Sequence, residues 1–107
     1  MTLTDFQTLL ETTGLPVAYG RFTEEYIKQE GVTLPFIVWM NEADDNFGAD
    51  NVVHFVAHGI RIELYEDIRD PVTEGKVETA LKDIYYTKDA VYVEDERVYE
   101  IIYQTEV

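Results

Sequence analysis

The chain has 107 residues, of which 46% are hydrophobic and 13% aromatic, so residues 1–107 are expected to form one domain with a real core. Asp and Glu number 22 against 8 Lys and Arg, which gives a formal net charge of −14. This balance argues against specific nucleic-acid binding, because phosphate contacts require basic side chains, and against an anionic membrane surface. The chain has no cysteine, which excludes disulfides, thiolate metal sites and thiol nucleophiles.

The N-terminal third is predicted to form a helix, a strand and a connection. Thr4 and Gln7 have the spacing of a capping box, so a helix is expected to begin at Thr4, and Gly14 is expected to stop it. Residues 15–22 are expected to form the first strand, with a proline near its start. Residues 23–34 are expected to form a loop or a helical turn.

The middle of the chain is predicted to hold two strands on either side of an acidic loop. Residues 35–41 are a short apolar run rich in β-branched and aromatic residues, typical of a strand buried on both faces. Residues 41–51 contain several acids and no base, and are predicted to form a loop. Residues 52–66 alternate between apolar and polar, but the parity changes around His58 and Gly59, so a bulge or bend is expected at Gly59.

The C-terminal part is predicted to form a helix and a hairpin. Asp70 is suited to the N-cap and Pro71 to the first helical position. The inward stripe of this helix is expected to be Val77, Ala80, Leu81 and Ile84. Residues 85–93 and 97–106 are expected to pair as a hairpin with 94–96 at its tip. The pattern predicts an α+β fold, a mostly antiparallel sheet of about five strands with two helices packed on it.

No pattern in the chain predicts a catalytic residue, a cofactor or a metal site. His54 and His58 are four residues apart, but no third ligand with a characteristic spacing accompanies them, which favours ordinary strand histidines. A calcium loop counted from Asp44 would need Gly at the sixth position and Glu at the twelfth, where this chain has Ala49 and Phe55. Neighbouring carboxylates are expected by composition alone among 22 acids, so they are a weak indication of acid–base chemistry.

The eight tyrosines raise the question of a subunit interface. Tyr combines a large apolar area with a polar tip and is enriched in interfaces, although ordinary strand propensity also explains it. Two short helices are too few to cover both faces of a five-stranded sheet, so a neighbouring subunit is a candidate for the second cover. The tyrosines proposed for this interface are Tyr85, Tyr92, Tyr99 and Tyr103.

The order of several segments resembles a family of known proteins. These segments are Thr-Gly-Leu-Pro-Val-Ala-Tyr at 13–19, Leu-Pro-Phe-Ile-Val-Trp at 34–39, the Asn-Phe-containing acidic loop at 45–50, Ile-Glu-Leu-Tyr at 62–65, Asp70-Pro71 with the following helix, and Glu-Arg-Val-Tyr-Glu-Ile-Ile-Tyr-Gln-Thr-Glu-Val at 96–107. In this order they resemble the tail terminator, tail completion and minor capsid proteins encoded among the head–tail joining genes of long-tailed phages and prophages of Gram-positive bacteria. The resemblance covers nearly the whole chain, and its motifs are structural rather than chemical.

The resemblance implies a non-enzymatic assembly protein. Tail terminators form a ring, hexameric in this type, that caps the tail tube and docks the head connector, so the implied partners are further copies of the chain, the tail tube protein and the head connector proteins. An acidic lumen in such a ring would repel DNA phosphates and let DNA pass. The implied location is the host cytoplasm during assembly and then the neck of the virion. This agrees with an N-terminus that has no signal-peptide pattern and with the absence of an apolar run of about 20 residues.

The acidic loop is the expected contact with a tail or head partner. Phe47 is an aromatic side chain in a polar loop, so it either packs back on the core or anchors a partner, and Phe47→Ala is expected to reduce joining without unfolding the subunit. The predicted contact residues are Asp44, Asp45, Asn46, Phe47 and Asp50.

Three other functions stay open from sequence. A head-side adaptor or another neck component has a similar pattern. A small acidic inhibitor that imitates DNA would act as a monomer or dimer on a basic enzyme. An enzyme using carboxylates would require a concave site and titratable groups with perturbed pKa values.

Overall fold

The computed structural model describes residues 1–49 and 52–107, with side chains described outside 46–55. Its elements are α1 (Leu3–Glu11), β1 (Val17–Tyr19), α2 (Glu24–Glu30), β2 (Phe36–Ala49), β3 (Val52–Glu66), α3 (Pro71–Ala80), β4 (Tyr86–Val93) and β5 (Val98–Glu106). The five strands form one sheet in the order β1-β2-β3-β5-β4. Strands β1 and β2 are parallel and the other pairs are antiparallel. The predicted α+β class with a mostly antiparallel sheet is confirmed, and the described residues hold three helices where two were predicted.

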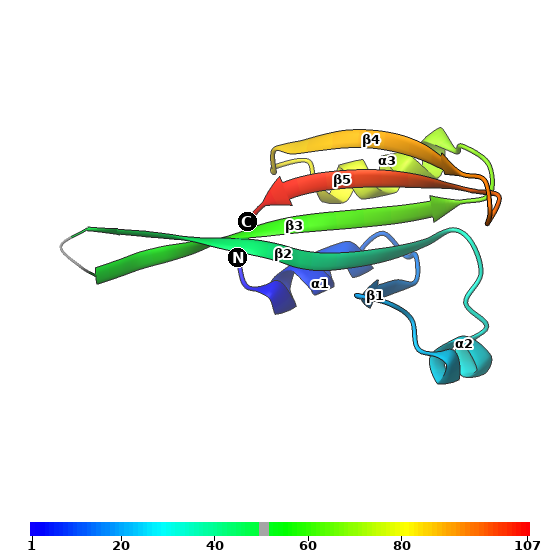
Figure 1. Ribbon diagram of the computed structural model, residues 1–107, viewed down its shortest axis with the longest axis horizontal. Coiled ribbons are helices and arrows are strands. Elements are labelled where there is room, and N and C mark those ends of the chain that lie inside the picture. Colours follow the sequence, from blue (N-terminus) through cyan, green and yellow to red (C-terminus); the bar gives the residue numbers. More distant parts are fainter. Residues whose placement is uncertain (50–51) are drawn as a thin grey trace.

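Helices α1 and α3 cover one face of the sheet, behind the strands in the view of Figure 1. Alternate side chains of the three central strands point toward these helices and form the core. The buried core comprises Phe6, Leu10, Ile37, Trp39, Ile60, Ile62, Leu64, Val77, Leu81, Ile101 and Tyr103. Helix α2 has no buried residue and stands apart from the other two helices, beyond the β1 edge (Figure 1).

The helix boundaries follow from their caps. Helix α1 begins two residues earlier than predicted, because the Thr2 hydroxyl accepts the Asp5 N–H at 3.0 Å and takes the N-cap role expected of Thr4. This start brings Leu3 onto the apolar face that packs against the core. The start of α3 is confirmed, since the Asp70 carboxylate accepts the Val72 N–H at 3.0 Å. The helix ends at Ala80, so Leu81 and Ile84 of the predicted stripe pack on the core from the segment that follows it.

The segment predicted as a helical turn or loop forms α2. The Thr23 hydroxyl accepts the Tyr26 N–H at 3.1 Å and caps the helix. Gly31 ends it at φ 64°, a left-handed conformation that glycine adopts without a Cβ penalty. The Phe22 ring connects this helix to the sheet, with centroids 5.6 Å from Tyr26 and 5.4 Å from Phe36.

The prediction of a loop over residues 41–51 is wrong for residues 41–49, which continue β2. Their backbone pairs with β3 as far as Ala49 opposite Val52. Asp, Asn and Gly have low strand propensity, but pairing with the alternating segment 52–66 overrides that preference. Gly59 lies opposite Glu106, and His58 exchanges two backbone hydrogen bonds with Val107. On the N-terminal side of His58, β2 is the only strand beside β3 among the described residues. The two strands therefore project beyond the others as a ribbon, the arm, comprising residues 42–49 and 52–58 (Figure 1).

A bulge marks the base of the arm, where an irregularity was predicted at Gly59. Asn41 pairs with Ile60 and Ala43 with Gly59, so the extra residue is Glu42 on β2 rather than a residue of β3. A Cβ at Gly59 would lie 2.9 Å from the Ala43 carbonyl oxygen, which explains the glycine. Because the extra residue lies on β2, β3 alternates without interruption through Gly59. Ala57 and Ile60 are both buried but point to opposite faces, which explains the change in parity seen in the sequence.

The C-terminal hairpin is confirmed. Its tip is a turn over residues 94–97 between β4 and β5, and Val93 pairs with Val98. Strand β5 lies between β3 and β4, and β4 forms one edge of the sheet. All but the first and last residues of β4 are exposed.

Candidate assembly surfaces and a buried ion network

The base of the arm is held by a cluster of polar side chains. The Asp44 Oδ1 accepts from Asn41 Nδ2 at 3.0 Å and lies 2.8 Å from His58 Nδ1. Asn41 Nδ2 also donates to the Gly59 carbonyl at 3.0 Å, which joins the two strands across the bulge. The hydrogen bond with His58 lowers the pKa of Asp44, so this carboxylate is ionised at neutral pH. The cluster positions the start of the arm and leaves Asp45 exposed.

Of the predicted partner contacts, Asp44, Asp45, Asn46 and Phe47 therefore lie on a strand rather than on a loop. Asp44 and Asp45 are both exposed, and Asp44 is engaged with His58 while Asp45 pairs through its backbone with Ala57. The side chains of Asn46 and Phe47, and the whole of Asp50, lie outside the described residues.

The four tyrosines proposed for an interface have different environments. Tyr85 is 99% exposed and Tyr92 is 47% exposed. Tyr99 is half-buried and packs against Tyr92, with ring centroids 4.9 Å apart. Tyr103 is fully buried in the core, so its place in a subunit interface is a wrong prediction. It faces α3 because it shares the parity of Ile101, which the alternation of β5 predicts.

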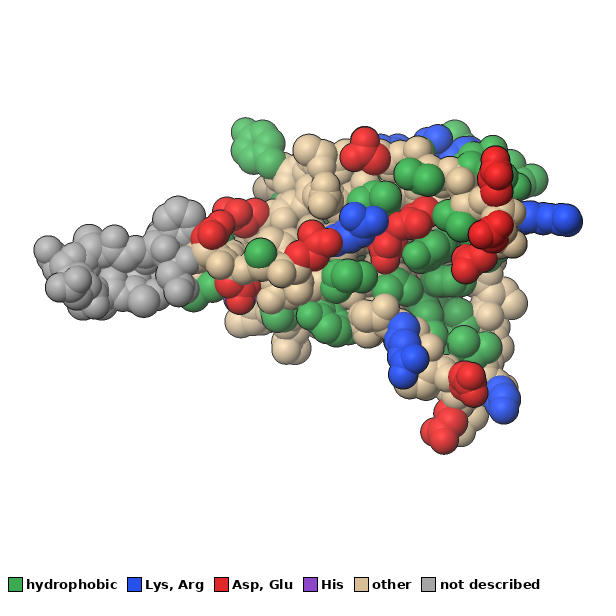
Figure 2. Space-filling model, in the orientation of Figure 1, with side chains coloured by type: hydrophobic (Ala, Val, Ile, Leu, Met, Phe, Trp, Pro, Cys, Tyr) green, Lys and Arg blue, Asp and Glu red, His purple; other side chains and the backbone are tan. Residues whose placement is uncertain are grey.

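The second face of the sheet, the open face, is not covered by α1 or α3. Figure 2 shows this face, where charged side chains lie among hydrophobic ones. Arg61 lies between two carboxylates, with its Nε 3.4 Å from Glu63 Oε2 and its Nη2 3.4 Å from Glu100 Oε1. Partial burial, with the neighbouring Glu100 carboxylate, raises the pKa of Glu63 to about 7. One guanidinium therefore serves two carboxylates on this face.

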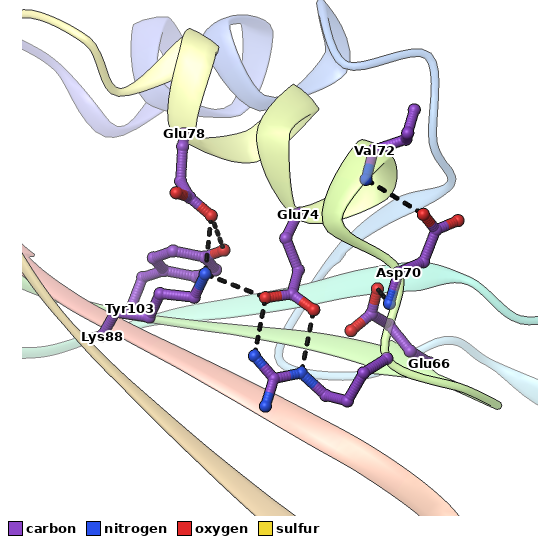
Figure 3. Close-up of polar contacts among 8 residues, drawn as sticks. Glu66, Asp70, Val72, Glu74, Glu78, Lys88 and Tyr103 are labelled. Carbon is purple, nitrogen blue, oxygen red and sulfur yellow. Dashed lines mark hydrogen bonds and ion pairs between the residues drawn. The ribbon is translucent and has the colours of Figure 1, made fainter.

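A larger ion network lies on the other face, where α3 packs on the sheet (Figure 3). Glu74 of α3 is 3% exposed and accepts two hydrogen bonds from Arg69, both of 2.9 Å. Lys88 of β4 lies 2.8 Å from Glu74 and 2.9 Å from Glu78, so it joins two turns of the helix. The Tyr103 hydroxyl donates to Glu78 at 2.9 Å. These contacts fasten α3 to β4 and β5.

Glu66 at the end of β3 completes this network. It is 1% exposed, and its Oε2 accepts the Asp70 N–H at 3.2 Å while Oε1 has no hydrogen-bond partner among the described residues. Burial, with the neighbouring Glu74 carboxylate, raises the pKa of Glu66 to about 7. The bond from Arg69 instead lowers the pKa of Glu74 to about 2. When Glu66 holds a proton, the network contains two carboxylates, Glu74 and Glu78, and two cations, Arg69 and Lys88. Its charges are then balanced.

The network was missed from sequence, although one signal points to it. Glu66 continues the parity of the buried Ile62 and Leu64, so its side chain had to face the core. Its cationic neighbours come from the β3–α3 connection and from β4, and no local spacing links these segments. The arrangement is structural, because Glu66 and Glu74 are buried and every carboxylate oxygen of this pair except Glu66 Oε1 has a partner.

The described residues contain no group of three or more His, Cys, Asp or Glu side chains placed to hold a metal ion. No helix among them is long and apolar enough to cross a membrane. No protein-family model matches this chain, and a search of curated proteins finds no match either.

Proposed function

We propose that this chain is a structural subunit of a phage neck, a tail terminator that assembles as a ring, hexameric by its resemblance to that family. The ring caps the tail tube and joins it to the head connector. The DNA-permissive lumen expected for such a ring agrees with the net charge of −14 per subunit.

The observation that carries this proposal is the arm. It is a two-stranded ribbon that extends past the end of β5 and has no further strand beside it among the described residues. A ribbon of two strands is at best marginally stable in water by itself, so a projecting one is expected to rest on another molecule. A compact enzyme or a monomeric inhibitor has no need of such a projection.

The open face supports the same proposal. Val91 on this face is 47% exposed, and Val98 and Ile102 are half-buried. Together with Tyr85, which is 99% exposed, these residues offer apolar area that a neighbouring subunit would cover. Apolar side chains that no helix covers are expected on the contact surface of an assembly component. They are not expected on a protein that acts as a monomer.

The first experiment is to measure the mass of the purified chain in solution by light scattering and to image the same peak by negative stain. A closed ring with a central hole is the expected result. A monomer would be tested next with purified tail tubes, and it is expected to bind the tube end as a ring. A discrete dimer that ignores tail tubes and captures a basic protein would overturn the proposal in favour of a DNA-mimicking inhibitor.

A head-side adaptor differs from a terminator in its binding partner. The ring is therefore to be offered tail tubes and DNA-filled heads separately. Binding to tubes in the absence of heads supports a terminator, and binding to heads alone supports an adaptor.

A further inference from the structure

We propose that the arm of one subunit docks into the groove between α1 and α3 of the next subunit. The inference rests on the proposed ring and adds to it the two surfaces that meet. The groove has a volume of about 670 Å³, and its wall on α3 includes Val72, Gly75, Lys76 and Thr79. Leu9 and Thr12 line it from α1.

The groove has a free apolar floor and a small-residue wall. Val72 is 72% exposed, so its side chain is available to an apolar group that enters the groove. Gly75 has no heavy atom within 4 Å of the position that a Cβ would occupy, so the groove is open at that point. A backbone can therefore approach α3 closely there.

The charges of the groove and the arm are complementary. Lys76 and Lys82 line the groove with a single acid, Asp83. Neither lysine has an ion-pair partner within 4.0 Å among the described residues. Arg21, Lys28 and Arg97 have none there either, but they do not line this groove. In a chain of net charge −14, two uncommitted lysines at one groove favour an acidic occupant.

The arm provides such an occupant. Its described side chains include exposed Glu42, Asp44 and Asp45, and residues 41–51 contain no base. Val56, which lies opposite Asn46 in the ribbon, is 38% exposed and offers an apolar contact for the groove floor.

The dimensions agree. The ten residues of α3 span about 15 Å, a length that four or five strand residues match. The eight residues 42–49 extend about 26 Å, which is enough to cross the boundary between two subunits. The groove and the arm are different surfaces, so their contact is head-to-tail, the kind of contact that closes a ring.

Charge reversal and its rescue test the contact. Lys76→Glu with Lys82→Glu is expected to weaken self-association at least about tenfold, and Glu42→Lys with Asp45→Lys to do the same. Combining the two pairs of changes is expected to restore assembly, because the complementarity is inverted rather than lost. Lys28→Glu on α2 is the matched control and should leave the mass distribution unchanged. Circular dichroism confirms that each variant is folded.

Cross-linking provides a second readout, because the wild-type chain has no cysteine. Asp45→Cys combined with Thr79→Cys is expected to give a ladder of covalent oligomers with a short bismaleimide, whereas Asp45→Cys with Lys28→Cys is not. The proposed contact is overturned if the charge-reversal variants assemble as the wild type does, or if the variant that combines both pairs of changes stays dissociated. A monomer at every concentration that yields no ladder overturns it as well. Capping of tail tubes by a ring whose groove variants assemble normally would retain the proposed function and reject only the contact.

Discussion

Strand β3 contributes to two clusters of acidic side chains, one on each face of the sheet, and these clusters differ in burial and in charge balance. On the face covered by α3, Glu66 lies in a network with Glu74, where carboxylates and cations balance once one proton is held. On the open face, Glu63 and Glu100 share one arginine and are less deeply buried, with 12% and 15% of their side chains accessible. The comparison teaches that burial, rather than the number of acids, decides which carboxylates hold the fold together.

The largest expected effect comes from breaking the buried cluster. Glu74→Gln removes the charge that faces Arg69 and Lys88 and is expected to cost about 3 kcal/mol of unfolding free energy. Both cations retain some access to water, which keeps the loss at the low end for a buried pair. Urea unfolding followed by circular dichroism measures the loss. Equal stability of the variant and the wild type would show that the network contributes nothing.

The second effect is a dependence of stability on pH. The pKa of Glu66 is raised to about 7 in the folded protein, so the folded state holds a proton that the unfolded chain has released. Stability therefore falls as the pH rises between about 4.5 and 7, and the loss from this group is on the order of 2 kcal/mol. Glu66→Gln retains a hydrogen-bond donor that does not titrate and is expected to reduce this slope. The part that comes from Glu63, whose pKa is also raised to about 7, remains.

Lowering the pH also reduces the stability of the fold, in this case through Glu74. Its pKa is lowered to about 2, so its contribution is present at neutral pH and is lost as the pH falls from about 4.5 toward 2. The wild type is thus expected to lose stability on both sides of mildly acidic pH. Urea midpoints at several pH values measure both limbs. An unchanged neutral-pH slope in Glu66→Gln would assign it to Glu63 and the overall negative charge.

The third prediction separates tyrosines of the core from those of the surface. Tyr103→Phe removes the hydroxyl that donates to Glu78 and is expected to cost about 1 kcal/mol. Tyr85→Phe is the matched control, because Tyr85 is 99% exposed, and its unfolding midpoint should not change. Thermal or urea unfolding distinguishes the two variants. Equal effects would contradict the assignment of Tyr103 to the core.

The sequence predicted those parts of the fold whose signals are local. The Asp70-Pro71 cap, the stripe around Val77 and the final hairpin depend on neighbouring residues, and each was found. The arm was missed because its β2 strand is rich in residues that disfavour strands, and only pairing with β3 orders it. Tyr103 was assigned to an interface because residue type was weighed above the parity of its strand.

The candidate surfaces were harder to predict than the fold. The acids of the arm were recognised as a group, but the groove proposed to receive them lies between α1 and α3, which are some 60 residues apart in the chain. The buried network has the same character, since Lys88 reaches Glu74 only after α3 has packed on β4. Contacts of this kind form only through tertiary packing, so no fixed spacing of residues along the sequence predicts them.

The smallest effect is expected on the open face, and it tests the comparison most sharply. Glu100→Gln removes a carboxylate that crowds Glu63 but leaves Arg61 paired with Glu63. Its loss should change the unfolding free energy by less than about 0.5 kcal/mol, since relief of the repulsion between Glu100 and Glu63 offsets the lost contact with Arg61. The pKa of Glu63 should nevertheless fall from about 7, because Glu100 contributes to raising it. Carboxyl chemical shifts across a pH titration measure that fall directly. An unfolding cost as large as that of Glu74→Gln would mean that the two faces are held by the same kind of network.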